Sequence, residues 1–424
     1  MPMTNQLNIV CGADIHQRFL VATILCRDGR TWANRFLMNL NGLIDFKSWL
    51  VSHGCQKVAV ESTGRFWIPV HMILEGTIDV IVANAYKIKH IPKKKTDLKD
   101  SEWLAELCLN DMIEPSRIFP KEDRELRNLT RTREAYVRDL SKEKNRIHNV
   151  LESCSIKLAS VISDIFGKSG MHILKGLLSG TSIDEVLKGI PDKRVREKKS
   201  EELRDALMGK LEATDIFLIR QSLQIMSQFE MRIEELDREI RSRIASRPMD
   251  IKILRSIPGI GMVSAYTILA EIGNYLDFKK PEQLAMWAGL VPSVYQSADK
   301  LITGGITKQG SKHLRWILVQ VAHAIAHAKG GKLKKFFLKI RAKKGYLVAV
   351  VALARKVLCL IHHLLVNQEM YEEEGRLSKR DAQIPKNKNL AILTIEDMIQ
   401  CIAQAGYEVK KVNFGLPITA GHAR

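Results

Sequence analysis

The stretch Lys95-Thr96-Asp97-Leu98-Lys99-Asp100 places two carboxylates three residues apart among lysines, and a helix-like run follows it at residues 101–109. Residues three apart share a face of a helix, so Asp97 and Asp100 should point to the same place. Two acids that lie so close repel each other unless a cation lies between them. A hard divalent metal with oxygen ligands is the natural candidate. The alternative is a solvated helix start, where acids favour the helix dipole.

Upstream of this stretch, residues 7–83 read as an alternation of short strands and helices. Turn signals such as Asp28-Gly29 separate the first apolar runs, which predicts an antiparallel meander of three strands. We expect strands at residues 7–11, 19–26, 31–38, 57–60 and 78–83, and helices at residues 43–51 and 67–74. With the helix after Asp97, the predicted order is βββαβαβα.

Two further acids stand where predicted strands end. Asp14 follows the first strand and Glu61 follows the fourth. Ligands of α/β sheets gather at the ends of the strands, so both carboxylates should lie at one edge of the sheet. The sequence therefore predicts that Asp14, Glu61, Asp97 and Asp100 converge on one site.

Three short motifs follow one another in this region: Gly12-Ala13-Asp14, Val60-Glu61-Ser62-Thr63-Gly64 and residues 95–100. Their order resembles the RNase-H-like nuclease fold in its RuvC-like branch. More closely, it resembles the insertion-sequence transposases whose acidic set is called DEDD. In that family the last acid is usually followed by alanine, where this chain has Ser101.

The resemblance implies a role for each acid of the set. It implies that the four acids are catalytic and hold Mg²⁺: Asp14, Glu61, Asp97 and Asp100. Lys95, which stands beside them, is expected to contact nucleic acid.

The next region has apolar residues at helical spacing among many charges, at residues 121–155 and again at 201–244. A segment that bears glycines and lysines, residues 167–200, joins the two stretches. This pattern predicts two long amphipathic helices that form an antiparallel coiled-coil arm. We expect the arm to mediate dimerisation, and the alternative is a helical bundle that spaces two domains.

Pro248 marks a boundary, and Ser256-Ile257-Pro258-Gly259-Ile260-Gly261 leads into an apolar helix at residues 263–272. A Pro-Gly-x-Gly turn between helices is typical of a helix-hairpin-helix. Gly259 and Gly261 would let backbone N–H groups approach a phosphate at a helix N-terminus. The alternative is an ordinary tight turn between packed helices.

A second block resembles the C-terminal domain of the same transposase family. Trp287-Ala288-Gly289-Leu290-Val291-Pro292 matches its Ala-Gly-Leu-x-Pro motif, and residues 304–315 match its Gly-x-Ile-(Ser/Thr)-Lys-x-Gly motif with the following helix. The family carries a serine in the loop between these motifs. The matching position is Ser297, and Ser293 is the competing candidate.

Nothing near Ser297 in the sequence activates a serine, because no His or Asp stands at a spacing that would make a triad. A metal held by the acids could activate a coordinated oxygen and polarise a phosphodiester. The resemblance implies a composite site with the acids of one protomer and the serine of another. Three basic residues of the second motif are expected to bind nucleic acid: Lys308, Lys312 and Arg315.

The chain of 424 residues carries 66 Lys and Arg against 47 Asp and Glu, which gives a net charge of +19. This surplus favours a polyanionic partner, either nucleic acid or an anionic membrane. The basic residues 329–344 predict a helix with a phosphate-binding face. The apolar residues 346–366 predict a buried helix rather than a membrane span, because charged residues and histidines interrupt them. No signal peptide is visible, and the scattered cysteines suit reduced thiols in a bacterial or archaeal cytoplasm, near the nucleoid.

Taken together, these patterns predict an α/β plus all-α chain with four parts. They are a RuvC-like metal-binding domain at residues 1–120, a coiled-coil arm at 121–247, a C-terminal transposase domain at 248–370, and a polar tail at 371–424.

The resemblance implies transposition through serine attack on a phosphodiester of donor and target DNA, in a dimer or tetramer guided by a bridge RNA. Guide pairing would then supply the specificity while the protein reads backbone. One alternative is a metal-dependent, junction-resolving nuclease of the RuvC-like branch. Another is a non-catalytic scaffold that binds nucleic acid.

Overall fold

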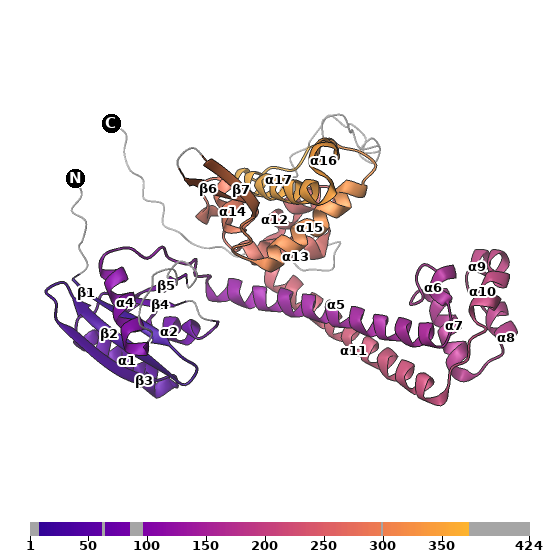
Figure 1. Cartoon of the computed structure of the whole chain (residues 1–424), viewed down its shortest axis with the longest axis horizontal. Coiled ribbons are helices and arrows are strands. Elements are labelled where there is room, and N and C mark those ends of the chain that lie inside the picture. The colour runs from indigo at the N-terminus through magenta and orange to yellow at the C-terminus, as the bar shows by residue number, and fades with distance from the viewer. Residues whose placement is uncertain (1–7, 62–63, 85–95, 298–299, 373–424) are drawn as a thin grey trace, which may run out of the picture.

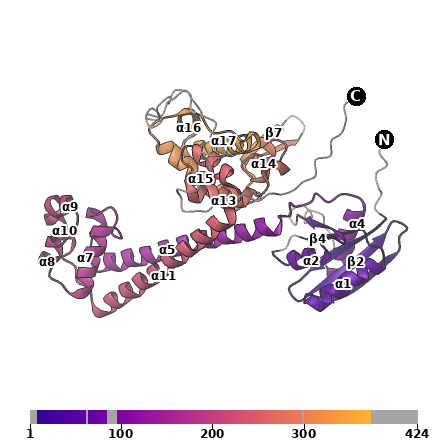
Figure 2. The same cartoon turned by 180° about the vertical axis from the view of Figure 1, so that it is seen from behind.

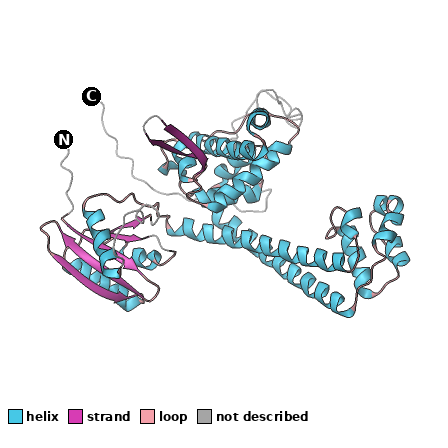
Figure 3. Ribbon diagram, in the orientation of Figure 1, coloured by secondary structure: helices cyan, strands magenta, loops and turns pink. Residues whose placement is uncertain are grey.

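The computed structural model describes residues 8–61, 64–84, 96–297 and 300–372. The N-terminal part is a mixed five-stranded sheet with helices on both faces, and the rest of the described chain is mostly helical (Figures 1 and 3). The predicted tail at residues 371–424 lies almost wholly outside the described residues.

The sheet contains strands β1 (Ile9–Ile15), β2 (Phe19–Cys26), β3 (Thr31–Leu37), β4 (Lys57–Glu61) and β5 (Asp79–Ala83). Its spatial order is β3-β2-β1-β4-β5, in which the first three strands pair antiparallel and β1, β4 and β5 pair parallel. The helices of this part are α1 (Leu40–Ser52), α2 (Trp67–Leu74) and α4 (Asp97–Leu109). Among the described residues, the predicted order βββαβαβα is confirmed.

Helix α4 packs directly on β1 because Gly12 has no side chain. A Cβ at Gly12 would lie 2.1 Å from the carbonyl oxygen of Ser101 and 2.3 Å from the backbone nitrogen of Ala105. On this face Leu104 joins a core with Val10. The opposite face of the sheet is covered by apolar side chains of α1 and α2: Phe46, Leu50, Val70 and Leu74.

Two long helices, α5 (Lys121–Ser153) and α11 (Ala213–Ile244), lie side by side and extend away from the sheet (Figures 1 and 2). Ion pairs cross between them: Arg133 to Asp237 at 2.5 Å and Arg243 to Glu125 at 2.9 Å. Because the earlier position on one helix pairs with the later position on the other, the two helices run antiparallel. Two long antiparallel helices were predicted, and supercoiling between them remains a prediction.

The second long helix begins later than the sequence pattern predicts. The prediction of one helix over residues 201–244 is wrong before Ala213, because α10 (Ser200–Ala206) is a separate short helix. Gly209 follows it, and a Cβ at this position would lie 2.0 Å from the carbonyl oxygen of Cys154. The chain therefore passes directly over the end of α5 before it turns into α11.

Short helices cap the far end of the long pair and share a core with it. They are α6 (Leu158–Val161), α7 (Lys168–Ser179), α8 (Ile183–Lys188), α9 (Lys193–Lys198) and α10. Ile173 and Leu203 are fully buried there beside Ile147 of α5 and Ile219 of α11.

The C-terminal part packs around one apolar helix, α17 (Tyr346–Asn367). The other elements are α12 (Pro248–Ser256), α13 (Met262–Ile272), η1 (Tyr275–Asp277), α14 (Pro281–Trp287), β6 (Pro292–Ser297), β7 (Lys300–Ile306), α15 (Lys312–His327) and α16 (Lys332–Lys344). By length and composition alone α17 could cross a membrane, but half of its apolar window is buried. His362 is buried too, and its Nε2 lies 2.8 Å from the Phe278 carbonyl oxygen. The expectation of a buried core helix agrees with this packing.

The segment expected to be a loop around Ser297 is a β-hairpin. Strands β6 and β7 pair antiparallel, with Tyr295 opposite Ile302 and Ser297 opposite Lys300. Aromatic and β-branched residues such as Tyr295 and Ile302 favour strands.

Candidate active site

The strand register brings Asp14 and Glu61 to the same edge of the sheet. The last registered pair between the parallel strands β1 and β4 is Ala13 with Val60, and each acid is the next residue along its strand. Side chains alternate between faces along a strand, so Asp14 lies on the same face as Gly12, beneath α4. The two acids therefore stand on neighbouring strands at the edge where α4 begins.

Helix α4 contributes its first turn to this edge. The side chain of Thr96 caps the helix by accepting a hydrogen bond from the backbone N–H of Lys99 at 3.3 Å. Asp97 and Asp100 both lie in the first turn, where the helix dipole favours negative charge. Because Ser101 rests against Gly12, the start of α4 lies over the end of β1.

The pKa of the Asp14 carboxyl is shifted by its burial and by the charges of its neighbours. Burial raises the pKa of the Asp14 carboxyl above its ordinary value, and the carboxylates of Asp100, Asp97 and Glu61 raise it further, while His16 opposes them. The Asp14 side chain is 16% exposed, so solvent screens this repulsion only partly. The structure thus places Asp14 beside Asp97. The meeting of all four acids and their catalytic role remain predictions.

His16 belongs to the cluster, and the sequence analysis missed it. Its Nε2 lies 3.2 Å from Oδ2 of Asp14 and 3.5 Å from Oδ2 of Asp97. The ligand atoms of these three residues all lie within 4.8 Å of one another, a spacing that could hold a metal ion. The available signal was a histidine two residues after a candidate metal ligand.

The two candidate serines occupy different places in the β6–β7 hairpin. The hydroxyl of Ser293 donates a hydrogen bond to the Gly305 carbonyl oxygen at 3.1 Å, so it is already engaged within the hairpin. Ser297 is the last residue of β6, at the tip of the hairpin. The hairpin stands apart from the five-stranded sheet in both views (Figures 1 and 2).

The segment that is predicted to be a helix-hairpin-helix comprises α12, a tight turn and α13. Gly259 has a φ of +84°, which favours glycine, and a Cβ there would lie 3.0 Å from Cγ1 of Ile325 on α15. At Gly261, the N-cap of α13, nothing in the described chain beyond its sequence neighbours lies within 4 Å of a Cβ position. Gly259 thus has a packing role, whereas Gly261 presents an open helix N-terminus.

The other predicted nucleic-acid residues differ in how free their side chains are. Lys308 and Lys312 are exposed. Arg315 is half-buried, and its guanidinium donates hydrogen bonds to the carbonyl oxygens of Ala288, at 3.1 Å, and Gln309. Burial lowers the pKa of Arg315 below its ordinary value. Arg315 therefore has a structural role, and its binding of nucleic acid remains a prediction. Lys95 lies outside the described residues.

Two family models match this chain, one over the acidic edge and one over the C-terminal part. Residues 11–156 match a family model for DEDD-type IS110 proteins described as a transposase, and residues 251–338 match one described as the transposase IS116/IS110/IS902 family. Both matched ranges are thus similar to this family of insertion-sequence transposases. The first match contains the acidic edge, and the second contains the helix-hairpin-helix and the β6–β7 hairpin.

Several curated proteins are similar to this chain. A Coxiella burnetii protein named transposase for insertion sequence element IS1111A is 33% identical over 33% of this chain and 39% of its own length. A Yersinia enterocolitica protein named for element IS1328 is 24% identical over 62% of this chain and 69% of its own length. A Moraxella lacunata protein named pilin gene-inverting protein is 23% identical over 85% of this chain and 97% of its own length. This chain thus matches well under half of the length of the Coxiella relative.

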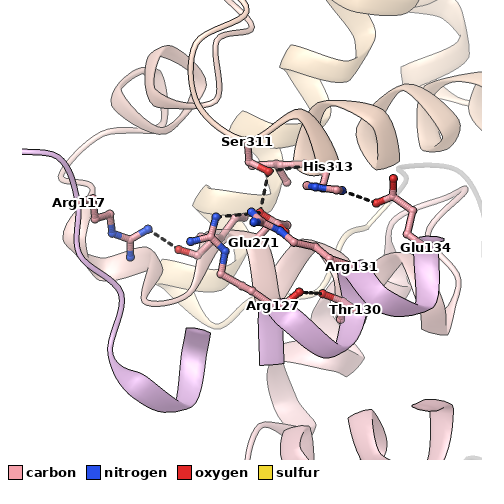
Figure 4. A network of polar contacts seen from close by, with 10 residues as sticks. Arg117, Arg127, Thr130, Arg131, Glu134, Glu271, Ser311 and His313 are labelled. Atoms are coloured by element: carbon pink, nitrogen blue, oxygen red, sulfur yellow. Dashed lines mark hydrogen bonds and ion pairs between the residues drawn. The ribbon is translucent and has the colours of Figure 1, made fainter. Parts of the chain in front are cut away.

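A buried ion-pair network, also missed from the sequence, joins the C-terminal part to α5 (Figure 4). Glu271 of α13 is fully buried and accepts hydrogen bonds from Arg131 at 2.6 and 2.8 Å and from Arg127 at 3.1 Å. Ser311, the N-cap of α15, donates to the same carboxylate at 2.7 Å. Burial raises the pKa of Glu271, but the Arg131 and Ser311 hydrogen bonds and both arginine charges outweigh it, so the net pKa lies below the ordinary value.

Two further contacts extend this junction. His313 Nδ1 lies 2.6 Å from Oε2 of Glu134 on α5. Arg117 donates to Oδ2 of Asp277 at 2.8 Å and to the Asn274 carbonyl oxygen at 2.6 Å. Arg117 belongs to the segment that leads from α4 to α5, and Asp277 belongs to η1. The residues around the second motif are therefore fixed against the base of the long helices.

Proposed function

We propose that this chain is a DNA transposase that exchanges strands by serine attack on a phosphodiester, with a divalent metal held at the acidic edge. The observation that carries the proposal is the grouping of Asp14, His16 and Asp97, whose ligand atoms lie within 4.8 Å of one another, in the range that matches the DEDD-type transposase model. The sheet order and the position of α4 support an RNase-H-like, RuvC-like fold for residues 1–120. The name of the Moraxella relative supports DNA recombination as the reaction class.

The residues at the edge fit a divalent metal. The ligand atoms of Asp14 on β1 and Asp97 in the first turn of α4 lie within 4.8 Å of one another, and Glu61 stands beside Asp14 on the adjacent strand. Oxygen ligands of this kind suit Mg²⁺. We assign the ligand role to Asp14, Glu61, Asp97 and Asp100. A bound Mg²⁺ would polarise the reacting phosphate and stabilise the charge that develops on it.

The nucleophile in this proposal is the Ser297 hydroxyl. Its oxygen forms a bond to the phosphorus of the DNA backbone, one bridging phosphorus–oxygen bond breaks, and the released DNA end leaves as a hydroxyl. Ser293 is the weaker candidate because its hydroxyl already donates to Gly305. The separation of the hairpin from the sheet supports a composite site, in which the serine of one protomer meets the acids of another.

Nucleic-acid contacts come from several elements in this proposal. Gly261 presents the open N-terminus of α13, and exposed Lys308 and Lys312 flank the second motif. The net charge of +19 suits a protein that binds both donor and target DNA. We extend the proposal to a bridge RNA that supplies the sequence specificity, and to an arm at residues 121–247 that mediates assembly into a dimer or tetramer.

The test uses the full-length protein with DNA that carries the ends of the element and the RNA transcribed from its flank. Ser297→Ala should abolish both strand exchange and the denaturant-resistant protein–DNA adduct. Ser293→Ala is the matched control and should retain both. Asp14→Asn should abolish them while DNA binding persists.

Each alternative has its own outcome in this test. Cleavage by Ser297→Ala, without an adduct in the parent protein, would identify a nuclease in which water attacks. Activity that survives Asp14→Asn and Glu61→Gln would exclude the metal mechanism. If removal of the RNA leaves target choice unchanged, the guide role is wrong although transposition can stand.

A further inference from the structure

The Nε2 atom of His16 is closed off from solvent at the acidic edge. The imidazole as a whole is 40% exposed, but this atom is buried and has no hydrogen bond of good geometry among the described residues. Its nearest charged neighbours are Oδ2 of Asp14 at 3.2 Å and Oδ2 of Asp97 at 3.5 Å. A buried ring nitrogen in this position needs a partner, because an unsatisfied buried polar atom is costly.

The ring of His16 is held in place by the turn between β1 and β2. Its backbone N–H donates to the Phe19 carbonyl oxygen at 2.9 Å, and the two rings lie 4.7 Å apart. The guanidinium of Arg35 covers the Phe19 ring at 3.7 Å. The contacts of the turn between β1 and β2 thus aim Nε2 at the acidic edge.

We propose that His16 is a nitrogen ligand of the metal at this edge, and that it shifts the metal preference of the site from Mg²⁺ toward a first-row transition-metal ion such as Mn²⁺. This inference rests on the proposed function, which requires a divalent metal at the same acids. Mg²⁺ takes oxygen ligands almost exclusively, whereas transition-metal ions accept imidazole nitrogen together with carboxylate oxygen. The set of Asp14, His16 and Asp97 supplies this mixed chemistry within 4.8 Å.

A different role for His16 makes the opposite prediction. As a cation that only balances the acids, it would compete with any metal, and its removal would tighten the binding of both ions. If His16 is a ligand, its removal deprives the metal of a donor atom. The affinity should then fall mainly for Mn²⁺, the ion that accepts nitrogen. The change in Mn²⁺ affinity therefore distinguishes the two roles by its sign.

The experiment measures Mn²⁺ and Mg²⁺ binding to the full-length protein by calorimetry. It also records the pulsed electron paramagnetic resonance of bound Mn²⁺, which detects a coordinated ¹⁴N nucleus. His16→Phe keeps the ring packing on Phe19 without a donor atom, and His16→Gln replaces the nitrogen with an amide. His327→Gln, on α15, is the control for loss of a histidine elsewhere.

We expect the parent protein to bind Mn²⁺ at least about tenfold more tightly than Mg²⁺, with a ¹⁴N signal. His16→Phe should lose the signal and weaken Mn²⁺ binding by roughly tenfold or more, with a smaller effect on Mg²⁺. His16→Gln should lose the signal and narrow the difference between the Mn²⁺ and Mg²⁺ affinities. An unchanged signal or tighter binding in both variants would overturn the inference and leave the metal site standing. If the parent protein binds neither ion, the proposed metal site itself fails and the inference falls with it.

Discussion

Arg131 of α5 donates two hydrogen bonds to the fully buried Glu271 of α13, from Nε to Oε1 at 2.6 Å and from Nη2 to Oε2 at 2.8 Å. This two-point geometry fixes the direction of the side chain as well as its charge. Since Ser311 caps α15 and bonds to the same carboxylate, one acid joins three elements. The orientation of the second motif relative to the long helices therefore depends on Glu271.

Glu271→Gln should destabilise the protein strongly at neutral pH. The substitution leaves the arginine charges that face Glu271 without a buried counter-charge, and breaking a buried pair in this way costs about 3–5 kcal/mol. Thermal and denaturant unfolding at pH 7 would measure the loss. Glu239→Gln, which breaks an exposed pair with Arg243, is the control and should leave the melting temperature nearly unchanged.

The same residue predicts how stability depends on pH. Its pKa in the folded protein lies below the ordinary value of 4.5, so the unfolded chain binds the proton more readily. Its contribution is then present above pH 4.5 and is lost as the pH falls through the lower folded value. The melting temperature of the parent protein should fall across this acid range. A comparable fall in Glu271→Gln would contradict the assignment to this residue.

Ser101 should cost more to remove than an exposed serine. Its hydroxyl is fully buried, lies 2.7 Å from Oγ1 of Thr23 and donates to the Leu98 carbonyl oxygen at 2.8 Å. Ser101→Ala leaves the Thr23 hydroxyl unpaired, at a cost of about 1–3 kcal/mol. The double variant with Thr23→Val should recover most of this loss. If the stability losses of the two single variants simply add in the double variant, the two hydroxyls do not depend on each other and this prediction is wrong.

The sequence was sufficient to predict the N-terminal sheet because its signals are local. Strand periodicity, the turn at Asp28-Gly29 and acids at strand ends fixed the order βββαβαβα before any long-range contact was known. The convergence of Asp14 with Asp97 followed from the rule that ligands gather at strand ends. The close packing of α4 on Gly12, in contrast, became evident only in the structure.

Long-range pairings were not predictable in the same way. Glu271 and Arg131 stand 140 residues apart, and no local pattern marks a glutamate in an apolar helix as the partner of a distant arginine. His16 was missed because its role depends on how α4 lies over β1. The late start of α11 was missed because helical periodicity continues through α10, although the chain turns at Gly209.

The two glycines of the helix-hairpin-helix should respond differently to alanine. Gly259→Ala forces a side chain into a left-handed conformation against Ile325 and should destabilise the protein by about 1–2 kcal/mol. At Gly261 the backbone has an ordinary φ of −90° and open space around it, so the melting temperature of Gly261→Ala should hardly change.

If α13 binds a phosphate, Gly261→Asp should weaken DNA binding through charge repulsion, while Gly261→Ala weakens it less. Filter binding at several salt concentrations would measure both, and equal affinity of Gly261→Asp and the parent protein would exclude this contact.

Asp14→Asn should stabilise the metal-free protein and remove its response to metal. The raised pKa of Asp14 reports that its ionised form is unfavourable in the fold, through burial and the neighbouring carboxylates. Since the folded protein holds this proton more readily than the unfolded chain, the carboxyl costs more stability as the pH rises through its folded pKa. The neutral amide removes this cost, so the melting temperature in chelator should rise at neutral pH.

A divalent ion at 100 times its dissociation constant should stabilise the parent protein by about 2.7 kcal/mol and the Asp14→Asn variant far less. Asp28→Asn, on the exposed turn after β2, controls for loss of an acid in the same sheet, and equal metal responses in all three proteins would place the metal elsewhere.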